Sequence, residues 1–424
     1  MISFVTSQTR CYGEKNSLLM NENHFGTSRR NFLKSTLTLP VALAAAPALL
    51  TQTVSAADAP AGILPQRELG KSGRKVTMLC MGGMMAALSP DYIDIAWSMG
   101  IRYFDTAKSY LNGKSEPIFA QWLAKYPERR KEIFLVSKDH PHSPEQLLEL
   151  VDARLKACGT DYLDAFYIHG IGPRDYGDDS LNWPKSDAYK KVAEQLKSSG
   201  KVKLVGFSCH DGRLVDYLNA AAEGGFLDLI MLQFNPFYPK GGPLDLALDA
   251  CHKAGIGLVA MKTLRDVKDV PKRLPEFDKL GLEVHQAKLH ACWSDPRISS
   301  VCNMIDNVDQ MQSSAAAARS YKEPLKFAHR ELLRETLLAG RRTMCIGCPA
   351  CEENAKQTNF AFQDIARFVT YYEQDGNIAA RDYYAALAAD HRDTSKVNLA
   401  ALRDACHFKT DYPEIIRRAE RYFA

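Results

Sequence analysis

In RYFDTAKSY (102–110) and in FLVSKD (134–139), a short apolar run is closed by an ionisable side chain. Asp105 closes the first run, Tyr110 follows in the next segment, and Lys138 closes the second run. Polar residues are ordinary where a strand meets solvent, so either position alone indicates only a strand end. Their repetition raises the question whether these side chains belong to one site.

The same pattern continues from about residue 64 to residue 318. Short apolar runs alternate with amphipathic segments, and near-continuous apolar runs are typical of strands that are buried on both faces. Eight runs fit this description: VTMLCM (76–81), IRYFDT (101–106), IFLVSK (133–138), DAFYIH (164–169), VKLVGFS (202–208), LIMLQF (229–234), IGLVAM (256–261) and ISSVCNM (298–304).

The segments between these runs carry helix signals. Ser89-Pro90 predicts a helix start, Ser143 to Gln146 predicts a capping box, and glycines at 100, 200 and 255 predict helix ends. Eight strand–helix units predict an α/β fold, the (β/α)8 or TIM barrel. The stretch QRELGKSGRKVTML (66–79), with Gly73 in its turn, predicts a hairpin before the barrel.

Active sites of this fold lie at the carboxyl ends of the strands. Asp105, Lys138 and His169 occupy such ends, and Tyr110 lies in the loop after Asp105. We therefore expect the four side chains to converge at one mouth of the barrel.

These four residue types suit proton donation to a carbonyl oxygen. A phenol with an ordinary pKa near 10 needs help to act as an acid at neutral pH. A lysine ammonium stabilises the phenolate and lowers its pKa, a carboxylate holds the lysine, and a histidine hydrogen-bonds the substrate carbonyl. Combined with hydride attack on carbon, this chemistry is carbonyl reduction.

The segments FDTAKSY, FLVSK and DAFYIHG closely resemble those that carry the catalytic tetrad of aldo-keto reductases. GKVKLVGFSCH (200–210) and MLQFNPF (231–237) extend the resemblance over about residues 64–318. It implies that Asp105, Tyr110, Lys138 and His169 are catalytic and that the substrate is a small carbonyl or alcohol.

The resemblance also implies a nicotinamide cofactor, NAD(P)(H), extended across the barrel mouth without a GxGxxG loop. Ser208 and Gln233 fall where the family holds the carboxamide, and Met261 stands where an aromatic residue usually stacks on the nicotinamide. Asp306 lies where many relatives place groups that favour a 2′-phosphate. Because an acid there would repel the phosphate, the choice between NAD and NADP stays open.

A charged helical linker is predicted over residues 321–342, followed by a small, mainly helical module over 343–424. Its run Cys345-x2-Cys348-x2-Cys351 is typical of thiolate ligation of an iron–sulfur cluster. Distant Cys406 supplies a fourth thiolate, so we expect one [4Fe–4S] cluster and a redox partner for it. The pattern resembles the ferredoxin-like tails of exported bacterial aldo-keto reductases, with His407 in place of the usual proline.

Other interpretations of the cysteines and histidines remain open. A four-cysteine zinc site and disulfides are alternatives for the module, whereas the six cysteines of the barrel are expected to be small core residues. His140 and His142 are interpreted as loop residues in solvent or near substrate, and a nucleophilic thiol at Cys209 is disfavoured because no third orienting group is evident.

The N-terminus predicts export. TSRRNFLKS (27–35), the apolar stretch 36–50 and VSA (54–56) resemble a twin-arginine signal cleaved after Ala56, which predicts a periplasmic protein. The apolar stretch is short and contains Pro40 and Pro47, so no stable membrane anchor is expected.

The charge balance argues against nucleic acid as a partner. The chain carries a net charge of +4, of which residues 1–56 contribute +3 (five Lys/Arg less two Asp/Glu), so the remainder carries +1. The alternative to an oxidoreductase is a non-catalytic or partner-dependent barrel that binds ligands and holds a structural four-cysteine metal site.

Overall fold

The computed structural model describes residues 62–268, 270–339, 345, 351 and 360–423. The chain divides into two units, residues 1–56 and 57–424, and the described residues all belong to the second. The predicted leader with its arginine pair, and Cys348, lie outside the described residues.

A two-stranded antiparallel hairpin precedes the barrel. Strand β1 (Gln66–Glu68) pairs with β2 (Lys75–Thr77), and the turn between them uses a left-handed Gly73 with φ of +68°. The predicted run 76–81 is divided, since β2 ends at Thr77 and the first barrel strand begins at Leu79. The Met78 carbonyl between them accepts hydrogen bonds from Val301 N at 2.8 Å and Trp293 Nε1 at 2.9 Å.

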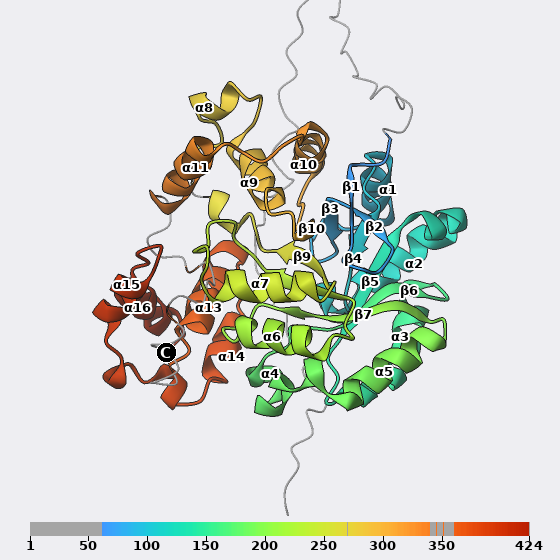
Figure 1. The fold of residues 1–424 in the computed structure, drawn as a ribbon, viewed down its shortest axis with the longest axis horizontal. Helices are drawn as coiled ribbons and strands as arrows, with labels where there is room; N and C mark the ends of the chain where they lie inside the picture. Colours follow the sequence, from blue (N-terminus) through green and yellow to red (C-terminus); the bar gives the residue numbers. More distant parts are fainter. Residues whose placement is uncertain (1–61, 269, 340–344, 346–350, 352–359, 424) are drawn as a thin grey trace, which may run out of the picture. The chain divides into compact units, whose positions relative to one another are not determined.

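Eight parallel strands close into a barrel in the order β10-β3-β4-β5-β6-β7-β8-β9, which confirms the predicted fold class. The strands are β3 (Leu79–Gly82), β4 (Tyr103–Asp105), β5 (Phe134–Asp139), β6 (Leu163–Ile168), β7 (Val202–Cys209), β8 (Leu229–Gln233), β9 (Gly257–Met261) and β10 (Ile298–Asn303). Figure 1 shows them at the centre of the ribbon, in colours from blue to orange.

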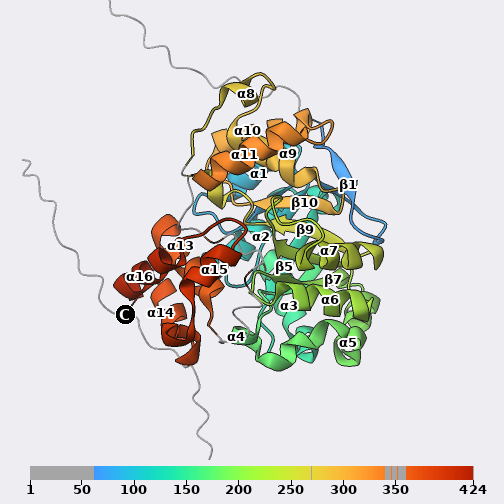
Figure 2. The same ribbon diagram turned by 60° about the vertical axis from the view of Figure 1, so that its left-hand side comes forward.

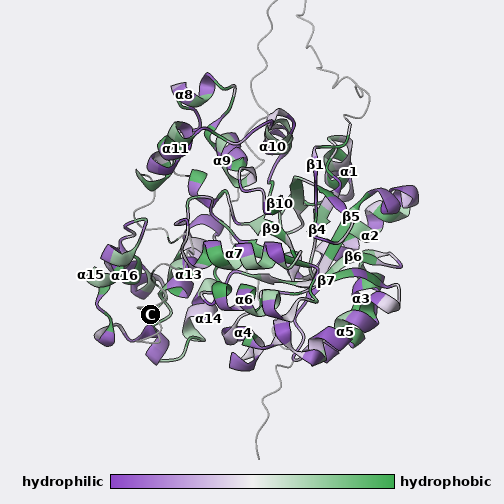
Figure 3. Ribbon diagram, in the orientation of Figure 1, coloured by the Kyte–Doolittle hydropathy of each residue, from purple (hydrophilic) through white to green (hydrophobic). Residues whose placement is uncertain are grey.

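Helices surround the strands (Figures 1 and 2). The main helices that follow the strands in order are α1 (Pro90–Ser98), α2 (Ser115–Lys125), α3 (Leu147–Cys158), α5 (Asp187–Ser198), α6 (Leu214–Gly224), α7 (Pro243–Lys253), α9 (Val284–Trp293) and α10 (Val308–Ser320). Two short helices, α4 (Pro173–Tyr176) and α8 (Pro275–Asp278), lie in the longer connections. Figure 3 shows mostly hydrophobic colours on the strands and hydrophilic stretches on outer helices such as α5.

Of the two helix starts predicted from local sequence signals, one is confirmed and the other is wrong. The Ser89 side chain caps α1 by accepting from Tyr92 N at 3.1 Å, as expected. The capping box at Ser143 is wrong: the segment Pro144–Gln146 is a 3-10 turn without a side-chain cap. The Gln146 side chain accepts a hydrogen bond from His142 N at 2.7 Å. A capping box would require it to accept from Ser143 N.

Period-two alternation along the strands fills the barrel interior. One buried cluster consists of side chains from inside the barrel, among them Tyr103, Val136, Tyr167, Met231 and Val259. Because side chains two residues apart share a face, the next inward position on each of these strands lies at the carboxyl end, where the barrel opens. This rule decides which residues reach the mouth.

The C-terminal region is mainly helical in its described part, with α11 (Phe327–Ala339), α13 (Phe362–Asp375), α14 (Ala380–Ala385), α15 (Leu399–Ala405) and α16 (Tyr412–Phe423). A second buried cluster joins Val284 of α9, Leu333 of α11 and Phe368 of α13. The segment predicted as a linker therefore includes a helix that is buried along one side. Among the described residues, no helix is both long and apolar enough to span a membrane.

Candidate functional site

The predicted catalytic residues occupy the inward positions at the top of the barrel. Asp105 lies two residues beyond Tyr103, Lys138 two beyond Val136, and His169 two beyond Tyr167. Register explains their proximity, because β4 pairs with β5 and β5 with β6. The structure thus brings together residues from three neighbouring strand ends.

Lys138 is the centre of this group. Its ammonium lies 2.6 Å from Asp105 Oδ1 and 2.7 Å from Oδ2, and it donates to Tyr110 Oη at 3.1 Å and to the Thr106 carbonyl at 2.9 Å. A lysine has three N–H donors, so Asp105, Tyr110 and Thr106 use them all. Lys138 is fully buried and Asp105 is 2 % exposed, so the geometry is fixed by the barrel itself.

Tyr110 is placed by an unusual loop. It begins a short turn, Tyr110–Gly113, in which Leu111 and Asn112 have φ of 52° and 54°. Non-glycine residues rarely adopt this left-handed conformation, and such strain concentrates at functional sites. The Tyr110 hydroxyl also lies 3.5 Å from Asp105 Oδ2.

The electrostatics of Tyr110 differ from the sequence-based expectation. Burial and then the charge of Asp105 raise the pKa of Tyr110 well above its ordinary value. The sequence predicted the opposite direction from Lys138 alone, because neither the burial of the phenol nor its closeness to Asp105 can be recognised in the sequence. The phenol therefore keeps its proton throughout the neutral range.

His169 borders the same space. Its Nδ1 lies 3.4 Å from Ser109 Oγ, and its ring meets Tyr110 edge-on with centroids 5.4 Å apart. His140 lies beside it at 4.6 Å, and Tyr176 donates to the His169 carbonyl. Burial, followed by the charge of Lys138, lowers the pKa of His169 well below its usual range, so the ring is a neutral donor or acceptor.

The three residues predicted to hold the cofactor end the next strands around the barrel: Ser208 on β7, Gln233 on β8 and Met261 on β9. They follow the same inward alternation, since Gln233 lies two residues beyond Met231 and Met261 two beyond Val259. Ser208 Oγ accepts from Gly170 N at 2.8 Å and keeps its own O–H as a donor.

These residues fit a nicotinamide dinucleotide. Donor and acceptor groups of Ser208 and Gln233 suit a carboxamide, and Met261 supplies an apolar surface at the edge of the interior cluster. Asp306, the acid that the sequence predicts to oppose a 2′-phosphate, is exposed, and its backbone N–H donates to Gln310 at 3.0 Å.

Helix α13 of the C-terminal region also reaches the barrel mouth. Arg367 donates to the carbonyl of His210, just after β7, at 2.8 Å, and the Lys262 ammonium, just after β9, donates to Tyr371. Asp375 pairs with Arg265 at 2.9 Å. Sequence reasoning missed these contacts. Lys262 carried the same signal as Lys138, a cation directly after an apolar run.

A cavity of about 710 Å³ lies between loops of the barrel and the C-terminal helices. Arg174 and Arg213 from the barrel and Asp364 from α13 line it, and no tetrad residue does. It is therefore a separate hollow beside the mouth.

The barrel cysteines are buried, as expected. Burial raises the pKa of Cys209 far above its ordinary value, so this side chain is a thiol and not a nucleophilic thiolate. Cys80 and Cys302 face each other across β3 and β10 inside the barrel.

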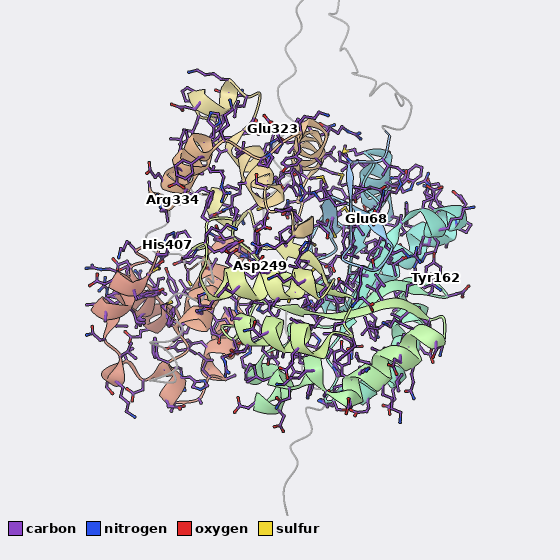
Figure 4. The ribbon with its side chains drawn as sticks, viewed as in Figure 1. Glu68, Tyr162, Asp249, Glu323, Arg334 and His407 are labelled. Carbon is purple, nitrogen blue, oxygen red and sulfur yellow. The ribbon has the colours of Figure 1, made fainter. Side chains whose placement is uncertain are left out.

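Three of the four predicted cluster ligands are described, and they belong to one neighbourhood. Cys351 Sγ lies 3.3 Å from Tyr412 Oη, and Cys406 Sγ accepts from Thr410 N at 3.5 Å. Burial and the charges of Cys345, Cys351 and Cys406 all raise the pKa of Tyr412. His407, labelled in Figure 4, is exposed. Among the described residues, no group of three or more His, Cys, Asp or Glu is placed to hold a metal ion.

Comparison with known proteins gives the family of the barrel. Residues 80–276 match the model of the aldo/keto reductase family. Residues 80–276 of the barrel are an aldo/keto reductase family domain. This confirms the prediction of an aldo-keto reductase-like oxidoreductase domain for the region that carries the four mouth residues.

Two curated relatives agree with this assignment. An uncharacterized oxidoreductase, YrpG, of Bacillus subtilis is 27 % identical over 221 residues, covering 46 % of this chain and 65 % of the relative. A D/L-glyceraldehyde reductase of Hypocrea jecorina is 30 % identical over 234 residues, covering 47 % of this chain and 66 % of the relative. The chain thus spans slightly less than two thirds of the length of each.

A solved structure confirms the fold of the aldo/keto reductase domain. The aldo-keto reductase AKR11C1 from Bacillus halodurans superimposes with a TM-score of 0.51 at 21 % identity, covering 64 % of this chain and 96 % of that one. The C-terminal helices extend beyond the family model's last matched residue, 276.

Proposed function

We propose that this protein interconverts a small carbonyl compound and its alcohol with a nicotinamide cofactor, and that reduction is the favoured direction. The observation that carries the proposal is the buried ammonium of Lys138, which contacts Asp105 at 2.6 Å and Tyr110 at 3.1 Å. A bound dinucleotide supplies the hydride, with Ser208, Gln233 and Met261 holding its nicotinamide end.

The chain's own residues supply the proton and the polarity. The Tyr110 hydroxyl, kept protonated by burial, donates to the carbonyl oxygen as negative charge develops there. Lys138 then stabilises the phenolate that remains, and Asp105 holds Lys138 in place. Neutral His169 orients the carbonyl by a hydrogen bond. Because burial keeps the phenol protonated at neutral pH, the phenolate that would have to take a proton from an alcohol is scarce, which favours reduction.

The test is stoichiometric turnover. Protein comprising residues 57–424 is incubated with NADH or NADPH and a panel of aldehydes that includes D/L-glyceraldehyde. We expect one alcohol formed for each nicotinamide oxidised. Bound dinucleotide without alcohol from any carbonyl would instead favour the non-catalytic binding protein.

We further propose that Cys345, Cys348, Cys351 and Cys406 ligate one [4Fe–4S] cluster that exchanges electrons with a redox partner. The run of three cysteines supports this assignment, as does the shared neighbourhood of Cys345, Cys351 and Cys406 around Tyr412. Exposure of His407 favours Cys406 as the fourth ligand.

Metal analysis tests the cluster. Anaerobically prepared protein should contain about four irons per chain. Cys406→Ser should lose iron, and the matched variant Cys302→Ser, inside the barrel, should retain it. Stoichiometric zinc without iron would contradict the cluster and support the four-cysteine structural site.

We propose, finally, that the twin-arginine route exports the chain to the periplasm with cleavage after Ala56. Arg29-Arg30, the short apolar stretch and the small residues before Ala57 support this proposal. Replacing both arginines with lysine should leave the precursor in the cytoplasm. Unimpaired export of that variant would contradict the proposed route.

A further inference from the structure

Two cysteines lie opposite each other inside the barrel. Cys80 of β3 and Cys302 of β10 are direct partners in the strand register, and both side chains belong to the interior cluster. The two side chains hydrogen-bond to each other, and burial together with this contact raises the pKa of the Cys80 thiol well above its ordinary value. Among the described strands, the register pairs no other two cysteines.

The pair lies at the seam where the barrel closes. β3 is the first barrel strand along the chain and β10 is the last, so their pairing joins the two ends of the barrel sequence. Three register pairs form this seam, and the cysteine pair is the middle one. A covalent bond here would therefore connect residues that are 222 positions apart (302 less 80).

The sheet places the two cysteines at a separation that suits a disulfide. Neighbouring strands lie about 4.7–4.9 Å apart, and directly paired residues have Cα atoms at about this distance. Disulfides usually join Cα atoms that are about 4.4–6.8 Å apart. Because both side chains already point into the barrel, a bond between them requires no change of strand register.

One of the two sulfur atoms is accessible from the barrel mouth. Cys302 is 8 % exposed, whereas Cys80 is 0 % exposed. Gly82 lies two residues beyond Cys80 and has no side chain that could cover the pair, and a Cβ added there would lie 3.5 Å from Cys302 Sγ. On the other side, the register partner of Cys302 is Met261, the last residue of β9. Cys302 is thus the thiol that a small molecule entering the mouth meets first.

We propose that Cys80 and Cys302 are a redox-active pair that a hydroperoxide converts into a disulfide across the barrel seam. With hydrogen peroxide, the Cys302 sulfur attacks one oxygen, which gives a sulfenic acid and releases one water. The Cys80 sulfur then attacks the sulfenic sulfur, the S–S bond forms, and the hydroxyl leaves with the Cys80 proton as a second water. Two thiols and one peroxide therefore give one disulfide and two waters.

The bond would make the stability of the barrel depend on its redox state. In the unfolded chain, a disulfide between these residues closes a long loop and so restricts the unfolded ensemble strongly. Oxidation should therefore stabilise the folded protein, and reduction by a thiol should reverse the effect. This proposal goes beyond the proposed function, since it requires neither a carbonyl substrate nor a nicotinamide.

Peptide mapping tests whether the bond forms. Residues 57–424 are treated with hydrogen peroxide, unfolded, alkylated with iodoacetamide and digested with trypsin. Cys80 and Cys302 fall in the tryptic peptides 76–102 and 298–319, each of which contains one cysteine. We expect these two peptides to appear as one linked species, lighter than their sum by two hydrogen atoms. Treatment with dithiothreitol before alkylation should remove the linked species.

Two variants make the mapping specific. Cys302→Ser should give no linked species after the same treatment. Cys251→Ser is the matched control, because Cys251 is a buried cysteine of α7 whose thiol donates to the Leu218 carbonyl at 3.2 Å. This variant should form the link between peptides 76–102 and 298–319 as the wild type does.

Thermal unfolding of the same samples measures the consequence. Peroxide should raise the unfolding midpoint of the wild type and of Cys251→Ser by about 3–5 °C. It should not raise the midpoint of Cys302→Ser, which also controls for oxidation of other side chains. Absence of the linked species in the oxidised wild type would overturn the proposal, as would a linked species whose midpoint is unchanged or lower.

Discussion

Two lysines at the barrel mouth, Lys138 and Lys262, differ in how their charges are balanced. Lys138 uses all three donors on groups of the barrel and lies on both oxygens of Asp105. Lys262 has no carboxylate partner among the described residues and contacts Tyr371 of α13. The side of the mouth formed by the four predicted catalytic residues, here the tetrad side, is therefore preorganised by the barrel alone. The other side, here the module side, is built from the barrel and α13, and it holds Lys262 near Arg367, Arg265 and Arg174 with Asp375 partly offsetting their charge.

Removing the balanced charge should have the largest effect. Lys138→Met leaves Asp105 buried without a cation, which typically costs about 3–5 kcal/mol of the free energy of unfolding. Carbonyl reduction should fall about 10²–10⁴-fold, the usual contribution of general acid catalysis. Denaturant unfolding and turnover measure the two effects.

The double variant Asp105→Asn/Lys138→Met provides the control for this prediction. It removes both charges and should recover much of the lost stability while staying inactive. A Lys138→Met protein as stable as the wild type would mean that the pair is not the internally balanced unit described above.

Acidic pH should lower the free energy of unfolding through one buried histidine on each side of the mouth, His169 and His210. Burial lowers the pKa of His169 and of His210 well below the usual range, whereas an unfolded histidine titrates near 6.5. The unfolded chain therefore binds more protons below that pH. The stabilisation is fully present above about pH 6.5 and is lost as pH falls towards the folded-state pKa, by about 1.4 kcal/mol per histidine and pH unit.

Unfolding free energies between pH 8 and pH 5.5 check this sign. His169→Asn should flatten the acid limb of the profile, and His252→Gln, at an exposed position on α7, should not. A stability that rises on acidification through pH 6 would show that the buried histidines are protonated in the folded protein.

Replacing Lys262 should change the stability in the opposite direction to replacing Lys138. In the absence of ligand, Lys262→Met relieves a desolvated cation crowded by Arg367 and Arg265, so we expect a gain of about 1 kcal/mol in stability. Thermal unfolding without added anions measures it. A loss comparable to that of Lys138→Met would show that Lys262 is a structural residue and would erase the contrast between the two sides.

The smallest effect is expected at the edge of the contact between barrel and module. Asp375→Asn removes a partly exposed pair with Arg265, and such pairs contribute about 0.2–1 kcal/mol. Thermal unfolding in low and high salt should show a small difference that salt reduces. A loss well above this range would mean that α13 is held to the barrel mainly by this pair.

The tetrad side was predictable from sequence, and the module side was not. Asp105, Lys138 and His169 end apolar runs, and period-two alternation carries all three to one mouth. Arg367 and Tyr371 lie 157 and 109 residues from their partners His210 and Lys262. No local sequence pattern predicts contacts between residues that lie so far apart in the chain.

Two local predictions were wrong because another group near the residue interacts with it more strongly than the predicted partner. A sequence motif does not show these neighbours. Gln146 accepts from His142 and so does not complete the predicted capping box. For Tyr110, the sequence suggested the help of Lys138 but not the burial and the neighbouring Asp105 that raise its pKa. In both cases the residue was identified correctly and its strongest partner was not.

The rate of carbonyl reduction by Tyr110→Phe, under single-turnover conditions with bound nicotinamide, tests the central claim most directly. The substitution keeps the ring and removes only the hydroxyl that Lys138 contacts at 3.1 Å. Tyr162→Phe is the matched control, since Tyr162 lies just before β6, at the amino end of the barrel (Figure 4). We predict that Tyr110→Phe folds normally and reduces the carbonyl about 10²–10⁴-fold more slowly, with Tyr162→Phe unaffected. A wild-type rate in Tyr110→Phe would contradict the account.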